Sequence, residues 1–143
     1  MARREKRLRN KGSAGNNRKT GEDFLVQNSK KKGVTEVGSG LQFFIVDEKT
    51  GDKPGMLDTI KIHQRALLLD GKILIDTYRL NKSDEVKVDE LIEGLQEGLQ
   101  MMSVGSRYKF WIPAELGWGR KGSGNKIPPN AVLYFDIRLV EIC

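Results

Sequence analysis

Residues 122–142 read GSGNKIPPNAVLYFDIRLVEI, a glycine-rich and proline-containing loop followed by an apolar–polar alternation. Alternation with a period of two is typical of a strand that buries one face. Proline fixes its own φ angle, so Pro128 and Pro129 are expected to hold the end of the loop in one conformation. The stretch therefore predicts a last strand over residues 131–142, preceded by a long, preformed loop over residues 115–130.

The preceding hundred residues combine similar strands with one convincing helix. The helix is predicted over residues 89–102, where apolar residues recur at helical spacing: Leu91, Ile92, Leu95, Leu99 and Met102. Asp70 and Gly71 form a strong hairpin signal. The other strands are predicted over residues 40–46, 58–69, 72–78, 84–88 and 106–113. Five or six strands against one central helix predict an α+β domain with an antiparallel sheet.

The net charge of +6 comes from the N-terminal segment of the chain. Residues 1–33 hold eleven Lys and Arg residues against three acidic ones, and the remaining 110 residues hold fourteen against sixteen. Residues 1–19 lack apolar periodicity and are expected to be a basic, disordered tail. Residues 20–33 are expected to form a short lead-in helix capped by Thr20. The tail either solubilises the protein or makes weak, salt-sensitive contact with nucleic acid or ribosomes.

Cysteine content and hydropathy indicate the compartment. A single cysteine, Cys143, excludes an intramolecular disulfide and favours a reducing environment. No apolar stretch follows the basic N-terminus, as a secretory signal would require. No segment approaches the ~20 apolar residues of a membrane helix. We expect a cytoplasmic protein without membrane contact.

The sequence offers few groups for acid–base, nucleophilic or metal chemistry. Its only histidine, His63, lies in a predicted strand, and no cluster of ligating residues has metal-site spacing. GWGRKGSG, residues 117–124, lacks the strand–loop–helix context of a phosphate-binding loop. We therefore expect no metal and no cofactor. Prolyl isomerisation needs neither, because a dry apolar pocket can favour the twisted amide over the planar one.

Four motifs in family order resemble the FKBP-type peptidyl-prolyl cis-trans isomerases, the immunophilin family that binds tacrolimus and rapamycin. They are DTIKIH (58–63), LLLDGKILID (67–76), LIEGLQEGLQMMSVGSRYKFWIPAELGWG (91–119) and IPPNAVLYFDIRLVEI (127–142). The resemblance implies a twisted antiparallel sheet wrapped around one central α-helix, in a domain spanning residues 34–143. GEDFLVQNSKKKGVTEVGSGLQFF (21–44) is similar to the bacterial Mip/FkpA branch, with a truncated N-terminal region.

The resemblance also implies an activity and a site. The activity is isomerisation of Xaa-Pro bonds in proline-containing polypeptides, which assists protein folding without covalent or acid–base catalysis. The residues that match catalytic positions of the family pocket are Asp76, Trp118 and Phe135. The residues that match its substrate-binding positions are Gln64, Ile75, Val86, Leu91, Ile92, Leu95 and Ile127.

Several of these positions depart from the family pattern. Gln64 replaces a tyrosine, Leu95 replaces the tryptophan that floors the pocket, and Ile75 and Val86 replace two further aromatic residues. A shallower or wider pocket is expected, with less aromatic contact to a proline ring. Reduced activity and weak macrolide binding follow. The alternative is a non-catalytic peptide-binding or chaperone module on the same scaffold, tethered to nucleic acid or ribosomes by the basic tail.

Overall fold

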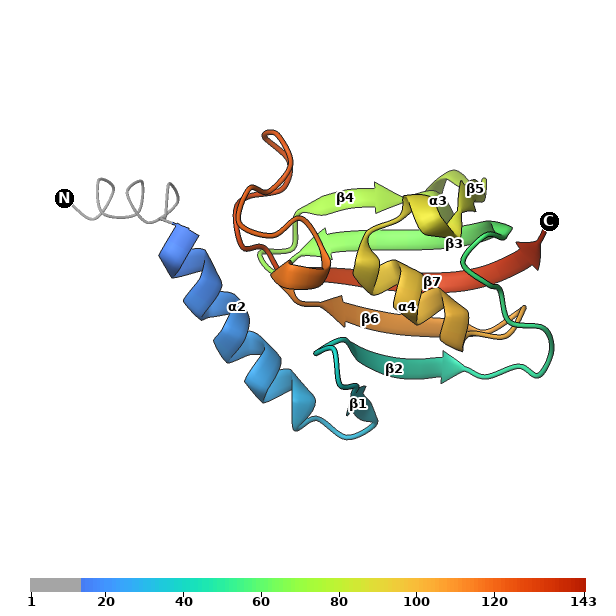
Figure 1. Cartoon of the computed structure of the whole chain (residues 1–143), viewed down its shortest axis with the longest axis horizontal. Helices are drawn as coiled ribbons and strands as arrows, with labels where there is room; N and C mark the ends of the chain where they lie inside the picture. The colour runs from blue at the N-terminus through green and yellow to red at the C-terminus, as the bar shows by residue number, and fades with distance from the viewer. Residues whose placement is uncertain (1–13) are drawn as a thin grey trace.

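Seven strands form one antiparallel sheet in the computed structural model, which describes residues 14–143 (Figure 1). Their spatial order is β1-β2-β6-β7-β3-β4, and β5 pairs with the same edge of β3 as β4. The bounds are β1 Val34–Glu36, β2 Gln42–Asp47, β3 Thr59–Leu68, β4 Ile73–Asp76, β5 Asp84–Lys87, β6 Arg107–Ile112 and β7 Leu133–Ile142. The α+β class and the antiparallel sheet predicted from the sequence are confirmed.

One helix, α4 (Glu93–Met101), lies across one face of the sheet, which we call the inner face (Figure 1). The strands alternate as the sequence predicts: Ile60, Ile62 and Ala66 of β3 are buried on this face. Leu95 and Leu99 of α4 pack into the same core. The helix is shorter than predicted because Val88–Glu90 form a 3-10 turn and Ile92 is extended, with φ −61° and ψ 153°.

Two glycines bring α4 into close contact with the sheet. A Cβ atom built on Gly98 would lie 2.6 Å from the ring of Phe110, and one on Gly94 would lie 2.6 Å from Ile112. Real Cβ atoms do not approach so closely. The helix backbone therefore rests directly on the side chains of β6.

The predicted strand over residues 72–78 ends early, at Asp76. A short helix, α3 (Thr77–Leu80), follows, and the carboxylate of Asp76 accepts the backbone N–H of Arg79 at 3.2 Å. This capping contact turns the chain away from the sheet. The hairpin turn at Asp70 and Gly71 is present, and the φ angle of Gly71 is +91°.

The N-terminal helix α2 (Ala14–Ser29) begins and ends earlier than the predicted lead-in helix. Thr20 lies inside it, so residues 14–19 are not the end of a disordered tail; residues 1–13 lie outside the described residues. Contacts with residues far along the chain hold this helix in place, and these contacts cannot be predicted from the sequence of the helix itself. The Asn17 side chain donates to the Pro129 carbonyl at 3.1 Å, and Gln42 donates to the Leu25 carbonyl at 2.8 Å.

Within residues 14–143, no helix has the length and apolar content needed to cross a membrane.

We predict that Gly98→Ala lowers the free energy of unfolding. Overpacking against the buried Phe110 ring costs about 1–3 kcal/mol, which exceeds the up to ~1 kcal/mol by which alanine favours a helix. Gly38→Ala is the matched control, because nothing lies within 4 Å of its added Cβ. Urea unfolding followed by circular dichroism measures both, and equal midpoints for the two variants would contradict the close helix–sheet contact.

Candidate functional site

A cavity of about 250 Å³ lies where α4, the inner face of the sheet and the loop 115–130 meet. Its walls are largely apolar. It brings together eight of the ten residues predicted from the sequence: Gln64, Ile75, Leu91, Ile92, Leu95, Trp118, Ile127 and Phe135. Four further residues line it, namely Ala66, Leu74, Glu90 and Leu133.

The floor of the cavity is set by the helix–sheet core. Leu95 is 3% exposed and Phe135 is 8% exposed, so both are fixed by packing on their far sides. Phe135 pairs with Ala66 of β3 and with Phe110 of β6. The small side chain of Ala66 leaves space beside the Phe135 ring. A pocket therefore forms at this point of the sheet instead of continuous core.

Trp118 lies at the rim of the cavity, on the loop between β6 and β7. Its side chain is 45% exposed, and its indole N–H has no hydrogen-bond partner within residues 14–143. The loop is braced around it: Gly119 has a φ of +60°, its N–H donates to the Ala114 carbonyl at 2.9 Å, and its carbonyl accepts from Asn130 at 2.8 Å. Ser123 and Ile127 form a further bridge. An exposed aromatic donor thus stands over an apolar floor.

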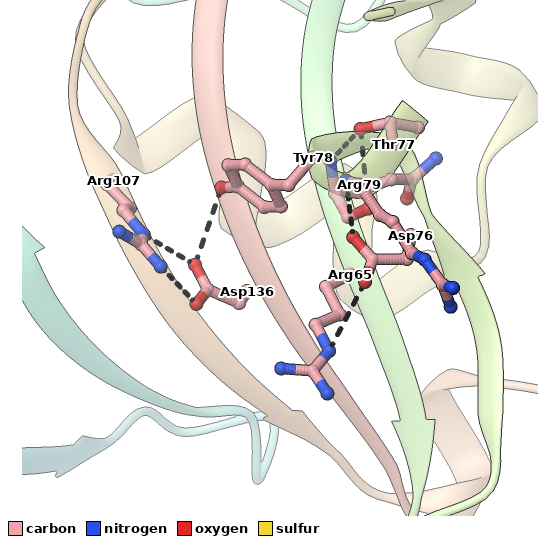
Figure 2. A network of polar contacts seen from close by, with 8 residues as sticks. Arg65, Asp76, Thr77, Tyr78, Arg79, Arg107 and Asp136 are labelled. Carbon is pink, nitrogen blue, oxygen red and sulfur yellow. Dashed lines mark hydrogen bonds and ion pairs between the residues drawn. The ribbon is translucent and has the colours of Figure 1, made fainter. Parts of the chain in front are cut away.

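Two predicted site residues, Asp76 and Val86, do not line the cavity. Asp76 follows Ile75 on β4, so strand alternation sends it to the opposite, outer face of the sheet, where it pairs with Arg65. Figure 2 shows its carboxylate between Arg65, at 3.6 Å, and the backbone of Arg79. Val86 pairs with Ile60 and packs against the core. The structure therefore gives Asp76 a capping contact and Val86 a packing contact.

The outer face carries a polar network of its own (Figure 2). Arg107 donates two hydrogen bonds to Asp136, at 2.8 and 2.7 Å, and its guanidinium lies 5.3 Å from the centre of the Tyr78 ring. Burial raises the pKa of Tyr78 to about 12, and the Asp136 carboxylate adds to the shift. These contacts tie α3, β6 and β7 together on the side of the sheet away from the cavity.

Three of the four lining residues that sequence reasoning missed differ in how they could have been found. Ala66 and Leu133 lie two residues from Gln64 and Phe135 on the same strands, so the period of two identifies them. Leu74 is the extra residue of a bulge in β4, opposite the step from Ala66 to Leu67. Nothing in the local pattern marks a bulge at this position.

The chemistry of the cavity follows from its lining. Gln64 and Glu90 supply the polar side-chain oxygens, Trp118 supplies an N–H donor, and the rest is hydrocarbon or aromatic ring. Within residues 14–143, no group of three or more His, Cys, Asp or Glu residues is arranged to hold a metal ion. The cavity can enclose a small apolar ring, exclude water from it and hydrogen-bond to the groups beside it.

Comparison with known families gives two matches along the chain. Residues 50–140 match the model of the FKBP-type peptidyl-prolyl cis-trans isomerase, and residues 1–45 match the domain amino terminal to FKBP-type peptidyl-prolyl isomerase. Together these matches cover the cavity, α4, the sheet and the N-terminal helix.

Two bacterial proteins are similar to this chain. FkpA of Aeromonas hydrophila, an FKBP-type peptidyl-prolyl cis-trans isomerase, is 40% identical over 126 residues, which are 88% of this chain and 47% of that protein. The outer membrane protein MIP of Legionella longbeachae is 36% identical over 142 residues, 99% of this chain and 60% of that protein. The chain thus spans about half the length of these relatives.

Solved structures share the fold. FkpA from Escherichia coli superposes with a TM-score of 0.86 at 32% identity, covering 90% of this chain and 60% of that chain. A peptidyl-prolyl cis-trans isomerase from Pseudomonas syringae superposes with a TM-score of 0.85 at 26% identity, covering 92% and 96%. The fold class and the family resemblance are confirmed.

We predict that the native protein resists ionisation of its tyrosines. Burial raises the pKa of Tyr78 and of Tyr108 to about 12, and it also raises the pKa of Tyr134. Tyrosinate absorbance should therefore appear well above pH 10 in the native protein and near pH 10 after unfolding in urea.

The same shifts give the sign of a stability change. Because the folded state favours neutral tyrosine, the buried tyrosines make their full contribution to the free energy of unfolding below about pH 10. This contribution is lost as the pH rises through about 12. Tyr78→Phe should remove part of this fall. A native tyrosinate midpoint near pH 10 would contradict the burial of these hydroxyls.

Proposed function

The chain belongs to the family of FKBP-type peptidyl-prolyl cis-trans isomerases. From this premise we propose that its inner-face cavity binds a proline side chain of a polypeptide and accelerates cis–trans rotation about the peptide bond that precedes this proline. The observation that carries this proposal is the convergence of eight expected site residues on one apolar cavity of about 250 Å³. The proposed substrates are proline-containing polypeptides, and the proposed role is assistance to protein folding.

The proposed mechanism uses environment rather than proton transfer. The barrier of ~18–20 kcal/mol arises from amide resonance, which makes the planar amide strongly dipolar. Twisting the bond removes the resonance and much of the dipole. The hydrocarbon walls formed by Ile92, Leu95 and Phe135 therefore disfavour the planar states more than the twisted state.

Trp118 contributes orientation in this proposal. Its indole N–H, which has no hydrogen-bond partner within residues 14–143, stands at the rim, within reach of the backbone of a polypeptide whose proline enters the cavity. A hydrogen bond from this N–H to a substrate carbonyl would fix the bond relative to the walls. The glycines on either side, Gly117 and Gly119, leave room for the substrate backbone to approach.

The aliphatic walls favour a lower activity than an aromatic cage would give. Leu95 offers less surface than a tryptophan and no ring face, and Ile75 likewise presents an aliphatic wall. The same loss of aromatic surface supports weak binding of macrolide inhibitors.

We predict that Trp118→Ala lowers kcat/KM for short Xaa-Pro peptides about tenfold, equivalent to ~1.4 kcal/mol of transition-state stabilisation. Because Trp118 is 45% exposed, the free energy of unfolding should change by less than about 1 kcal/mol. A protease-free assay of cis–trans exchange by NMR measures the rate. Asp76→Asn, outside the cavity, should retain the wild-type rate and serves as the control.

Two results would redirect this proposal. Equal rates for Trp118→Ala and the wild type would remove Trp118 from the site. A folded wild-type protein that binds Xaa-Pro peptides without accelerating their exchange would establish the alternative, a peptide-binding module that keeps the scaffold but does not catalyse.

A further inference from the structure

The edge of β3 beside the cavity is divided between two partner strands. Residues 65–67 pair with β4, and residues 59–62 pair with β5. Within the described chain, His63 and Gln64 have no strand partner on this edge. Thr77 takes that place: its hydroxyl oxygen accepts the backbone N–H of Gln64 at 2.7 Å and donates back to the Gln64 carbonyl at 3.4 Å. The backbone of Gln64 is therefore held between the two strands.

The side chain of Gln64 is held separately by Asp84, the first residue of β5. The Gln64 amide nitrogen, Nε2, donates to Asp84 Oδ2 at 3.0 Å. Asp84 pairs with Ile62, so it lies on the inner face beside Gln64. A carboxylate accepts hydrogen bonds and donates none, so it selects the NH₂ end of the amide. This contact fixes which end of the amide faces away from Asp84.

The other end of the amide is the acceptor oxygen, Oε1. Gln64 lines the cavity and is 7% exposed. Within residues 14–143, Oε1 has no hydrogen-bond partner, and it is not fully buried. Glu90, the other carboxyl or amide side chain of the lining, is exposed at the rim. Gln64 is therefore a buried polar side chain in a largely apolar lining, held at the nitrogen end of its amide.

We propose that Asp84 is a positioning residue that turns Gln64 Oε1 into the cavity, where it accepts a backbone N–H of the bound polypeptide beside the proline. This inference rests on the proposed function. The prolyl amide itself has no N–H, so the donor belongs to a flanking residue. A ligand that fills the cavity without such a donor leaves Oε1 dehydrated and unpaired, which disfavours that ligand.

The pocket then has two polar contacts of opposite kind. Trp118 donates at the rim, and Gln64 accepts at the wall formed by β3. A peptide backbone carries both complementary groups, a carbonyl oxygen and an N–H, on the residues next to proline. Selection by these two contacts requires a peptide backbone, which an apolar ring alone does not satisfy.

The test uses one Xaa-Pro peptide and two ester analogues, in which oxygen replaces the N–H of Xaa or the N–H of the residue after proline. The full chain is assayed with each for kcat/KM and for Kd by NMR titration. In the wild type, one of the two esters should show a kcat/KM about two- to tenfold lower, and a Kd about two- to tenfold higher, than the amide peptide. This is the size expected for one neutral hydrogen bond. Gln64→Met, similar in length but without an amide, should abolish this amide-to-ester ratio.

Asp84→Ala separates the positioning role from a structural one. It leaves the Gln64 amide free to turn over, so the amide-to-ester ratio should shrink toward one even if overall activity changes little. Glu85→Ala on the neighbouring, exposed position is the control and should keep the wild-type ratio. If Asp84→Ala keeps the full ratio, Asp84 does not position Gln64.

The outcomes distinguish this inference from the proposed function. The wild type could accelerate the peptide and both ester analogues with the same kcat/KM and bind them with the same Kd. This result overturns the Gln64 contact and leaves the isomerase proposal standing. Absence of acceleration for every peptide overturns the isomerase proposal, and the ratio of Kd values still decides whether Gln64 accepts the N–H. Should Gln64→Met fail to fold, Asp84→Ala gives the same ratio test.

Discussion

The direct contact between α4 and the inner face of the sheet is the constraint on which the cavity depends. Gly94 and Gly98 let the helix backbone rest on Ile112 and Phe110, so the helix cannot slide or lift without losing buried contact. Its first turn then fixes the position of Leu95, which lines the cavity together with Phe135. The cavity is the space that remains where the small Ala66 faces this end of the helix.

The strand period divides the chemistry between the two faces of β3. Gln64 and Ala66 face the cavity, and Arg65 between them joins the network on the outer face. The same rule separates Ile75 from Asp76 on β4. A residue can therefore match a family motif in the sequence and still lie on the other side of the sheet, as Asp76 does, because one residue along a strand is a change of face.

Sequence reasoning succeeded where the cause was local. The alternation in β3, β6 and β7 and the helical spacing around Leu95 are local patterns, and they predicted the antiparallel α+β fold. Most of the cavity lining was predicted from the motifs that resemble the family, which these same elements carry. It failed where the cause was tertiary. The early start of α2 depends on contacts such as that of Asn17 with the Pro129 carbonyl, and the role of Asp84 depends on β4 and β5 sharing one edge of β3.

The replacement of aromatic walls by aliphatic ones changes what the site can recognise. Aromatic surface contributes area and ring contact to any apolar ligand of suitable shape, whatever its backbone. A leucine floor contributes less of both, so directional hydrogen bonds decide a larger share of the discrimination between ligands. Gln64, held at its backbone by Thr77 and at its amide by Asp84, is ordered before a ligand arrives and loses little entropy on binding. Under the proposed function, a site of this kind favours peptide backbones over apolar rings.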